Sequence, residues 1–435
     1  MNPGRSHRRN LAALDVFKLW INNMQKKIEQ LINKGVIIPN PEGIEIGPDL
    51  NVDNISGDGV HIHNGCKLLG GATQIGPQTK LGAEAPVTIQ DCQLGPQVEL
   101  KGGYFNNSVF LEKASAGSGS HMRAGCLFEE EANSAHTVGL KQTILFPFVT
   151  LGSLINFCDC LMAGGTSRQN HSEVGSSYIH FNFTPNQDKA TPSLIGEVPK
   201  GVMLDQAPIF LGGQGGLVGP SRIAYGTIAA AGTILRKDVL HNNRMIIESA
   251  ARGGSVPYVA GRYRVIKRIV HNNLLYVGNL MALTQWYQYV RSQFTSDRFP
   301  NSLCQAAQHK IKINLNERIQ RLHQLADKMA RSIQNYTGNK GQTSDSQLLI
   351  QQQELFEKKD ALKDHLQTLS SYCGDEKRRD QFLNELQNSI HIYSQSYLQT
   401  IQTLAPATKQ MGSTWLQEIV DHVLESGLAI LPSFQ

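Results

Sequence analysis

Ile75-Gly-Pro-Gln-Thr-Lys-Leu81-Gly-Ala-Glu-Ala-Pro-Val87 is the stretch of sequence that decides the fold. An aliphatic residue recurs in it at every sixth position, and a glycine directly follows the first two of these residues. Side chains repeat every ~3.6 residues in an α-helix and every ~2 in a strand, so neither element explains this spacing. A short fixed period indicates a repeat architecture built from small, similar units.

The same pattern recurs outward, at Ile46-Gly47 on one side and, after a one-residue slip, at Leu94-Gly95 and Leu100 on the other. Each hexapeptide is then a short strand and a turn, and three of them make one triangular coil with the aliphatic residue inside. A β-sandwich with glycine-rich turns is the alternative, and it fits these runs poorly. We therefore predict a mainly β protein, a left-handed parallel β-helix of hexapeptide repeats running from about Val36 to Asp238.

Helices are expected on both sides of the β-helix. Residues 10–34 carry apolar side chains at mostly helical spacing, and Pro39-Asn-Pro-Glu-Gly43 ends that pattern. The predicted domains are an N-terminal amphipathic helix (1–35), the β-helix (36–240), a connector (241–276) and a C-terminal α-helical domain (277–435). Within that last domain we expect helices over residues 277–294, 302–336, 346–372, 376–404 and 414–428.

Charge and cysteine content narrow the class of protein. The 435 residues carry a formal net charge of +5, and the basic residues are scattered, which predicts no specific nucleic-acid partner. Phosphorylated sugars suit a mildly basic protein equally well. No apolar run approaches the ~18 residues of a membrane span, and no signal-peptide core is recognisable, so a cytoplasmic protein is expected. Seven cysteines predict reduced thiols. Cys158-Asp-Cys160 is too little for zinc, and no metal is predicted.

Two segments interrupt the repeat, Gly102 to Val138 and Asn182 to Leu211. Insertions in solenoids usually leave as loops on one face, which makes these segments candidates for a site. The glycine-rich Leu161-Met-Ala-Gly-Gly-Thr-Ser-Arg168 is similar to the nucleotide loop of sugar nucleotidyltransferases. It lies inside the repeats with no helix-forming pattern after it, so we do not interpret it as a phosphate-binding loop.

A family resemblance appears between Arg123 and Val239. Val174-Gly-Ser-Ser-Tyr-Ile-His-Phe-Asn-Phe183 is similar to the Ile-Gly-Ala-Gly-Thr-Ile-Thr-x-Asn-Tyr stretch of one acetyltransferase family, and Gly226 to Val239 is similar to its last coils. This part of the chain, about a quarter of it, resembles the acetyltransferase domain of bifunctional N-acetylglucosamine-1-phosphate uridyltransferase / glucosamine-1-phosphate acetyltransferase. The resemblance implies the same β-helix and a place in UDP-N-acetylglucosamine metabolism.

The resemblance also implies substrate-binding residues. Arg123 in Arg-Ala-Gly-Cys-Leu and Lys141 in Gly-Leu-Lys match the family's basic residues that hold the sugar phosphate. Asn182 matches its sugar-contacting asparagine, and Lys189 falls near its following lysine. A guanidinium and an ammonium group are suited to phosphate oxygens. The alternative for these basic residues is an ordinary solvated surface charge.

One departure from the family concerns the general base. Ser153-Leu-Ile-Asn-Phe-Cys-Asp159 aligns with the family's His-Leu-x-Tyr-x-Gly-Asp, so a serine stands where the catalytic histidine belongs. A serine hydroxyl cannot take the proton of an attacking amine unaided. His171, which we expect one coil beyond Ser153 on the same side of the prism, and His180 are the candidate catalytic bases. A polar surface or stacking histidine is the alternative for each.

The resemblance implies three functions. The first is a transferase of the hexapeptide-repeat class, moving an acyl group from acetyl-CoA or another acyl-CoA to an amino-sugar phosphate or UDP-sugar for the cell envelope. The pantetheine arm would then lie along Gly213, Ala230 and Ala231, and the protein would be a homotrimer. The second is a sugar-phosphate or UDP-sugar-binding protein without the base. The third, a UDP-N-acetylglucosamine pyrophosphorylase, lacks a recognisable nucleotidyltransferase domain.

Overall fold

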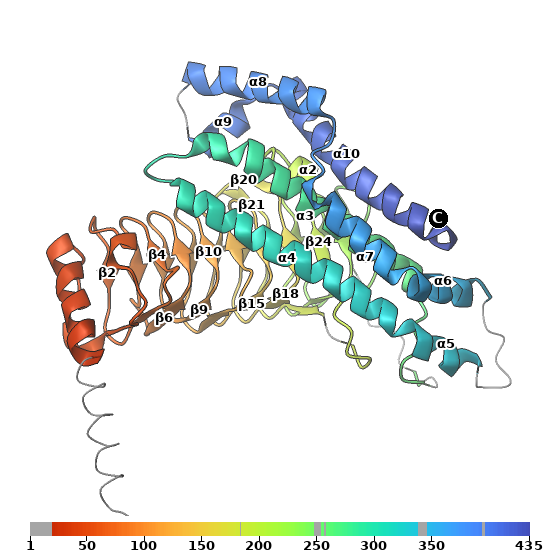
Figure 1. Cartoon of the computed structure of the whole chain (residues 1–435), viewed down its shortest axis with the longest axis horizontal. Coiled ribbons are helices and arrows are strands. Elements are labelled where there is room, and N and C mark those ends of the chain that lie inside the picture. The colour runs from red at the N-terminus through yellow and green to blue at the C-terminus, as the bar shows by residue number, and fades with distance from the viewer. Residues whose placement is uncertain (1–19, 183, 248–253, 256–257, 338–345, 394–395) are drawn as a thin grey trace, which may run out of the picture.

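The fold is seen in a computed structural model that describes residues 20–182, 184–247, 254–255, 258–337, 346–393 and 396–435. The predicted N-terminal helix falls partly outside the described residues. Its described part is helical over residues 20–34 and packs Ile28 and Leu31 against the first coil (Figure 1). That apolar face closes one end of the core that follows.

The predicted β-helix is confirmed as a three-sided parallel β-solenoid of about eleven turns over residues 45–246. Successive strands of the solenoid belong to different sheets, and every pair within its three sheets is parallel. The first sheet contains β1 (Glu45–Ile46), β3 (Lys67–Leu69), β6 (Val87–Gln90), β9 (Gly103–Asn106), β12 (Ser120–Met122), β15 (Gly139–Lys141), β18 (Asn156–Cys158), β23 (Ile179–Phe181), β26 (Gly216–Val218) and β29 (Ile234–Leu235). The second sheet contains β4 (Gln74–Ile75), β7 (Gln93–Leu94), β10 (Val109–Phe110), β13 (Leu127–Phe128), β16 (Ile144–Leu145), β19 (Cys160–Met162), β24 (Ser193–Ile195) and β27 (Arg222–Ile223). The third sheet contains β2 (His61–Ile62), β5 (Lys80–Leu81), β8 (Glu99–Leu100), β11 (Ser115–Ala116), β14 (Asn133–Ser134), β17 (Thr150–Leu151), β22 (Glu173–Val174), β25 (Phe210–Leu211), β28 (Ile228–Ala229) and β30 (Met245–Ile246).

Three corners join the sheets. We call the turn from the first to the second sheet the first corner, the turn from the second to the third the second corner, and the turn back to the first the third corner. The periodic aliphatic residues point into the prism, where Ile75 and Leu81 are buried. Non-glycine residues such as Leu154 and Asp159 take left-handed backbone angles at corners, with φ of 61° at both. Glycine therefore marks only some of the turns, although a left-handed turn favours it.

The expectation of an irregular segment between Gly102 and Val138 was wrong, because β9 to β15 stay in unbroken register. The aliphatic pattern fades there because smaller side chains, such as Ala116 and Ser134, fill interior positions. Irregularity is confirmed between Asn182 and Leu211, where a loop and the short helix α2 (Val198–Gly201) leave the prism. A hairpin of β20 (Gly165–Ser167) and β21 (Asn170–His171) also leaves it, at the second corner.

The C-terminal region is helical, as predicted, and covers one face of the solenoid (Figure 1). Its elements are α3 (Ile266–Tyr289), η3 (Arg291–Phe294), α4 (Asn301–Asp327), α5 (Met329–Thr337), α6 (Ser346–Glu357), α7 (Lys359–Thr368), η4 (Leu369–Ser371), α8 (Glu376–Tyr393), α9 (Tyr397–Thr403), α10 (Pro406–Ile430) and η5 (Pro432–Phe434). The first helix begins earlier than expected, at Ile266. α4 packs on β7 and β10, and α3 packs on β24, so the second sheet is the covered one. None of the described helices is long and apolar enough to cross a membrane.

Polar side chains at four-residue spacing attach α4 to the first corner. Lys310 donates to Asn107, and the Asn314 amide donates to the Gly125 carbonyl at 2.9 Å. Arg318 follows at the same spacing and donates to the Gln142 side chain at 2.9 Å. Residues four apart share one face of a helix, so these contacts follow successive coils along the first corner. This alignment brings α4 over the residues that the family resemblance singled out.

Candidate functional site

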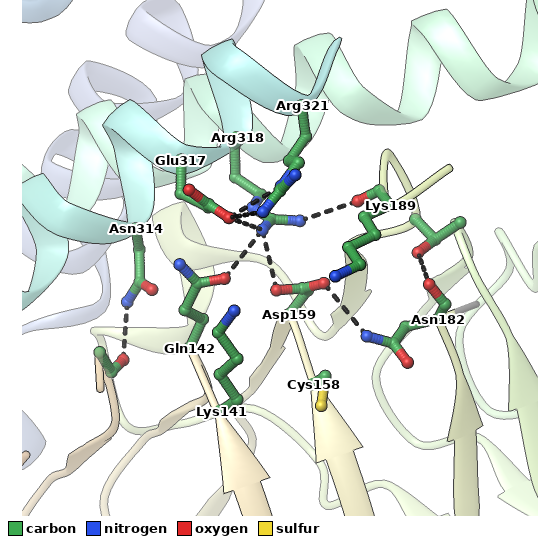
Figure 2. A network of polar contacts seen from close by, with 12 residues as sticks. Lys141, Gln142, Cys158, Asp159, Asn182, Lys189, Asn314, Glu317, Arg318 and Arg321 are labelled. Atoms are coloured by element: carbon green, nitrogen blue, oxygen red, sulfur yellow. Dashed lines mark hydrogen bonds and ion pairs between the residues drawn. The ribbon is translucent and has the colours of Figure 1, made fainter. Parts of the chain in front are cut away.

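A cavity of about 230 Å³ lies at the first corner, between the solenoid and α4 (Figure 2). All four residues predicted to bind the substrate line this cavity, together with residues from α4. We call it the corner pocket, and its lining residues are Arg123, Lys141, Gln142, Asn156, Cys158, Asp159, Asn182, Lys189, Glu317, Arg318 and Arg321. Residues that are far apart in the sequence thus meet in one small space.

The solenoid register places the pocket's basic side chains. The Arg123 amide donates to the Leu140 carbonyl at 2.9 Å, and Lys141 is the Cα partner of Cys158 in the parallel pairing of β15 with β18. Arg123, Lys141 and Cys158 therefore occupy equivalent positions on three successive coils. Neighbouring strands lie about 4.8 Å apart, so the two cationic side chains rise from the sheet side by side.

A buried ion pair crosses the pocket. The Arg318 guanidinium lies 2.8 Å from one Asp159 oxygen, with 2% and 5% of the two side chains exposed. Arg318 also donates to the Lys189 carbonyl at 3.3 Å. The Asn182 amide donates to the other Asp159 oxygen at 3.4 Å, as Figure 2 shows. Both carboxylate oxygens of Asp159 are therefore engaged by side chains of the protein.

The second carboxylate of the pocket is also paired. Arg321 contacts Glu317 one turn away on α4, at 2.7 Å. Neither Lys141 nor Lys189 forms an ion pair or a side-chain hydrogen bond with any described residue. Arg123 donates to the Cys158 sulfur at 3.4 Å, a neutral partner because burial raises the pKa of that thiol. Three cations of the corner pocket thus remain without a counter-charge in the described structure.

His180 points into the prism and not into the corner pocket. It is the register partner of Leu217 on the next coil, lies edge-to-face with the Phe157 ring and is 3% exposed. Its Nε2 lies 2.9 Å from the Ser193 hydroxyl. Burial lowers the pKa of His180 to about 4, so the imidazole is neutral near pH 7. The side chain fills an interior position that most coils give to an aliphatic residue.

His171 lies in the β20–β21 hairpin at the second corner. Its Nδ1 is 2.7 Å from the Arg168 carbonyl, and it is not among the residues that line the corner pocket. The prediction that His171 stacks one coil beyond Ser153 was wrong, because the hairpin adds residues to that coil. The Ser177 amide donates to the Ser153 carbonyl instead, at 2.8 Å. The structure thus brings the predicted binding residues together and leaves both predicted bases elsewhere.

The third corner holds a histidine that the sequence analysis overlooked. His136 is exposed, and its Nδ1 lies 3.0 Å from the Ser153 hydroxyl. The two residues are one coil apart, a spacing that could have identified the pair. An imidazole therefore contacts the serine that the resemblance aligns with a catalytic histidine.

The residues predicted to hold the acyl-CoA arm share this third corner. The Gln214 amide donates to the Ser176 carbonyl and the Gly232 amide to the Gly213 carbonyl, so these turns stack on the same corner as Ser153. A Cβ added to Gly213 would lie 2.8 Å from the Ser176 carbonyl oxygen, so the tight coil stacking already requires this glycine. Ala231 is exposed and Ala230 is half-buried, so the surface at this corner carries only small side chains at these two positions.

Other contributors to the pocket could not be recognised locally. Asp159 stood in the aligned stretch, but Arg318 comes from a helix whose basic residues look like a solvated face.

The glycine-rich segment that we did not interpret as a phosphate loop forms the end of β19 and strand β20. It makes a hairpin, with Arg168 donating to the Phe148 carbonyl at 2.6 Å.

Comparison with known proteins supports a distant relationship, although no family model matches the chain. It is 24% identical over 230 residues to the bifunctional protein GlmU of Thermotoga petrophila, covering 51% of this chain and 44% of that protein. The GlmU of Fervidobacterium nodosum is 26% identical over 215 residues, covering 49% and 42%, respectively. The GlmU of Trichlorobacter lovleyi is 26% identical over 211 residues, covering 48% and 40%. The chain spans less than half the length of these relatives, and the solenoid is consistent with their acetyltransferase β-helix region.

Proposed function

We propose that this distant relative of GlmU binds the phosphate group of an amino-sugar phosphate or a UDP-sugar in the corner pocket. The observation that carries the proposal is the charge of the pocket. Five cationic side chains and two carboxylates line it, a formal charge of +3. Ammonium and guanidinium groups bind phosphate through charge-assisted hydrogen bonds, and Asn182 adds an amide that can contact a sugar hydroxyl.

The size of the cavity supports a small ligand. Pockets for drug-sized molecules usually measure ~300–1,000 Å³, and the corner pocket is smaller, at about 230 Å³. That volume suits a phosphate with one sugar ring. A nucleotide sugar would place its uridine outside the cavity, so the sugar and its phosphate are the part of the ligand that the pocket recognises.

Replacing Lys141 by methionine is expected to weaken sugar-phosphate binding about 10- to 150-fold. The change removes one charge-assisted hydrogen bond to phosphate, an interaction worth about 1.5–3 kcal/mol, and keeps most of the side-chain volume. Isothermal titration calorimetry with N-acetylglucosamine-1-phosphate measures the effect. Lys80→Met, on the exposed face of the third sheet, is the matched control and should bind like the unaltered protein. Equal affinities for the two variants would show that the phosphate binds elsewhere.

Acyl transfer from acetyl-CoA is the second candidate, and the His136 contact with Ser153 favours it. In this reaction His136 would accept the proton of the attacking amine, and Gly213, Ala230 and Ala231 would lie beside the acyl-CoA arm. Within one protomer, however, the third corner and the corner pocket lie at opposite ends of the strands of the first sheet. A shared site would need a second protomer, as in a homotrimer, to bring the two corners together.

Thiol release separates the two candidates. If the chain is a binding protein, incubation with acetyl-CoA and glucosamine-1-phosphate releases no coenzyme A thiol above the rate without protein. Release that is saturable in both substrates and lost in His136→Asn would establish the acyltransferase instead. A His171→Asn variant is the control, because its imidazole lies at the second corner.

A further inference from the structure

The corner pocket has two carboxylates, and each of them is paired with an arginine of α4. Asp159 and Glu317 are the two acidic residues among the pocket's lining side chains. Arg318 and Asn182 occupy the oxygens of Asp159, and Arg321 pairs with Glu317. Both arginines that pair with these carboxylates come from α4, whereas Asn182 contributes only a neutral hydrogen bond. The helix therefore determines which charges the cavity presents.

The charges left over are all of one sign. Lys141 and Lys189 lack a counter-charge among the described residues, and Arg123 contacts only a neutral thiol there. Figure 2 shows the side chains of both lysines directed toward the space around Asp159. Like charges repel strongly in a partly buried site, where solvent screens them poorly. A ligand ammonium group would meet three cations without a counter-charge, whereas both carboxylates are already paired with arginines.

We propose that the corner pocket selects a sugar phosphate whose remaining groups are uncharged, such as an N-acylated amino sugar, and rejects one that carries a free ammonium group. This inference rests on the proposed function and specifies its ligand. Arg318 is the specificity-determining residue, because it occupies the buried carboxylate that would otherwise attract an ammonium. On this account the pocket holds the acylated form of the sugar and disfavours the amine that an N-acyltransferase must accept.

Calorimetric titration of the full chain tests the selectivity. At about pH 6.5 the amine of glucosamine-1-phosphate is protonated, since such amines titrate near pH ~8. N-acetylglucosamine-1-phosphate and glucose-1-phosphate should bind at least about tenfold more tightly than glucosamine-1-phosphate. Near pH ~9 the amine is neutral while lysine keeps its charge. The affinity for glucosamine-1-phosphate should then approach the affinities for the two uncharged sugars. Equal or tighter binding of glucosamine-1-phosphate at about pH 6.5 would overturn the inference.

Two variants test whether the ion pair of Arg318 with Asp159 determines the selectivity. Arg318→Met frees the carboxylate and should improve the relative affinity for glucosamine-1-phosphate by about tenfold or more. The double variant Asp159→Asn/Arg318→Met has no carboxylate to free and should keep the preference for the uncharged sugars. The same selectivity in both variants would overturn the role of Arg318. If the variants do not fold, the comparison of the three sugars on the unaltered protein still decides. Failure of all three sugar phosphates to bind would contradict the proposed function itself, whereas unselective binding contradicts only this inference.

Discussion

Replacing Arg291 by methionine is expected to lower the free energy of unfolding by about 3–5 kcal/mol, the usual cost of removing one partner of a buried ion pair. Arg291 is fully buried in η3 and forms an ion pair with Glu130, which belongs to the solenoid. Its guanidinium also lies 3.7 Å from the centre of the Tyr397 ring and 4.5 Å from that of Phe299. The variant would leave a buried carboxylate without its counter-charge.

Denaturant-induced unfolding measures this loss, with Arg298→Met as the matched control. Arg298 also pairs a guanidinium with a solenoid carboxylate, that of Glu112, but 56% of its side chain is exposed. Exposed ion pairs contribute about 0–1 kcal/mol, so the control should change little. A loss below about 1 kcal/mol for Arg291→Met would show that this contact does not hold the helical region on the solenoid.

Replacing Asp159 by alanine should also lower the free energy of unfolding by about 3–5 kcal/mol, but here the cation of the ion pair loses its partner. The change leaves the Arg318 guanidinium buried without its carboxylate, and 2% of that side chain is exposed. The double variant Asp159→Ala/Arg318→Met should recover most of the loss, because replacing both charges by neutral groups removes the unpaired ion. A double-mutant cycle measured by denaturant unfolding reports this recovery as a coupling energy.

Glu317→Ala is the control for the Asp159 prediction. It removes the other carboxylate of the corner pocket, and 25% of the Glu317 side chain is exposed, so a loss of about 1 kcal/mol or less is expected. Additive losses in the Asp159 cycle, with no recovery in the double variant, would contradict a strong coupling between Asp159 and Arg318. The pairing of α4 with the solenoid at this point would then need another explanation.

The fold was predictable because its signal is local. Ile75 and Leu81 lie one hexapeptide apart, and a residue with this spacing points into the prism whatever the rest of the chain does. The helical region was predictable for the same reason, since apolar spacing within each helix reports its own packing face. Insertions were harder to locate, because small interior side chains such as Ala116 imitate the loss of a repeat.

The corner pocket was predictable only in part. Arg123 and Lys141 keep a spacing of one coil, which the sequence displays directly. The position of His171 could not be read from the same arithmetic, since the β20–β21 hairpin adds residues to its coil. Arg318 was beyond reach, because its contact with Gln142 joins residues 176 positions apart and depends on how α4 docks. Long-range docking of a helix leaves no periodic trace in the sequence.

A crystal structure of the chain with N-acetylglucosamine-1-phosphate would locate the phosphate-binding site. We expect the phosphate in the corner pocket, with its oxygens within about 3 Å of the Lys141 and Lys189 ammonium groups, and the Asp159 ion pair with Arg318 intact. The sugar bound at another place, or bound with Lys141 and Lys189 directed into solvent, would contradict this expectation.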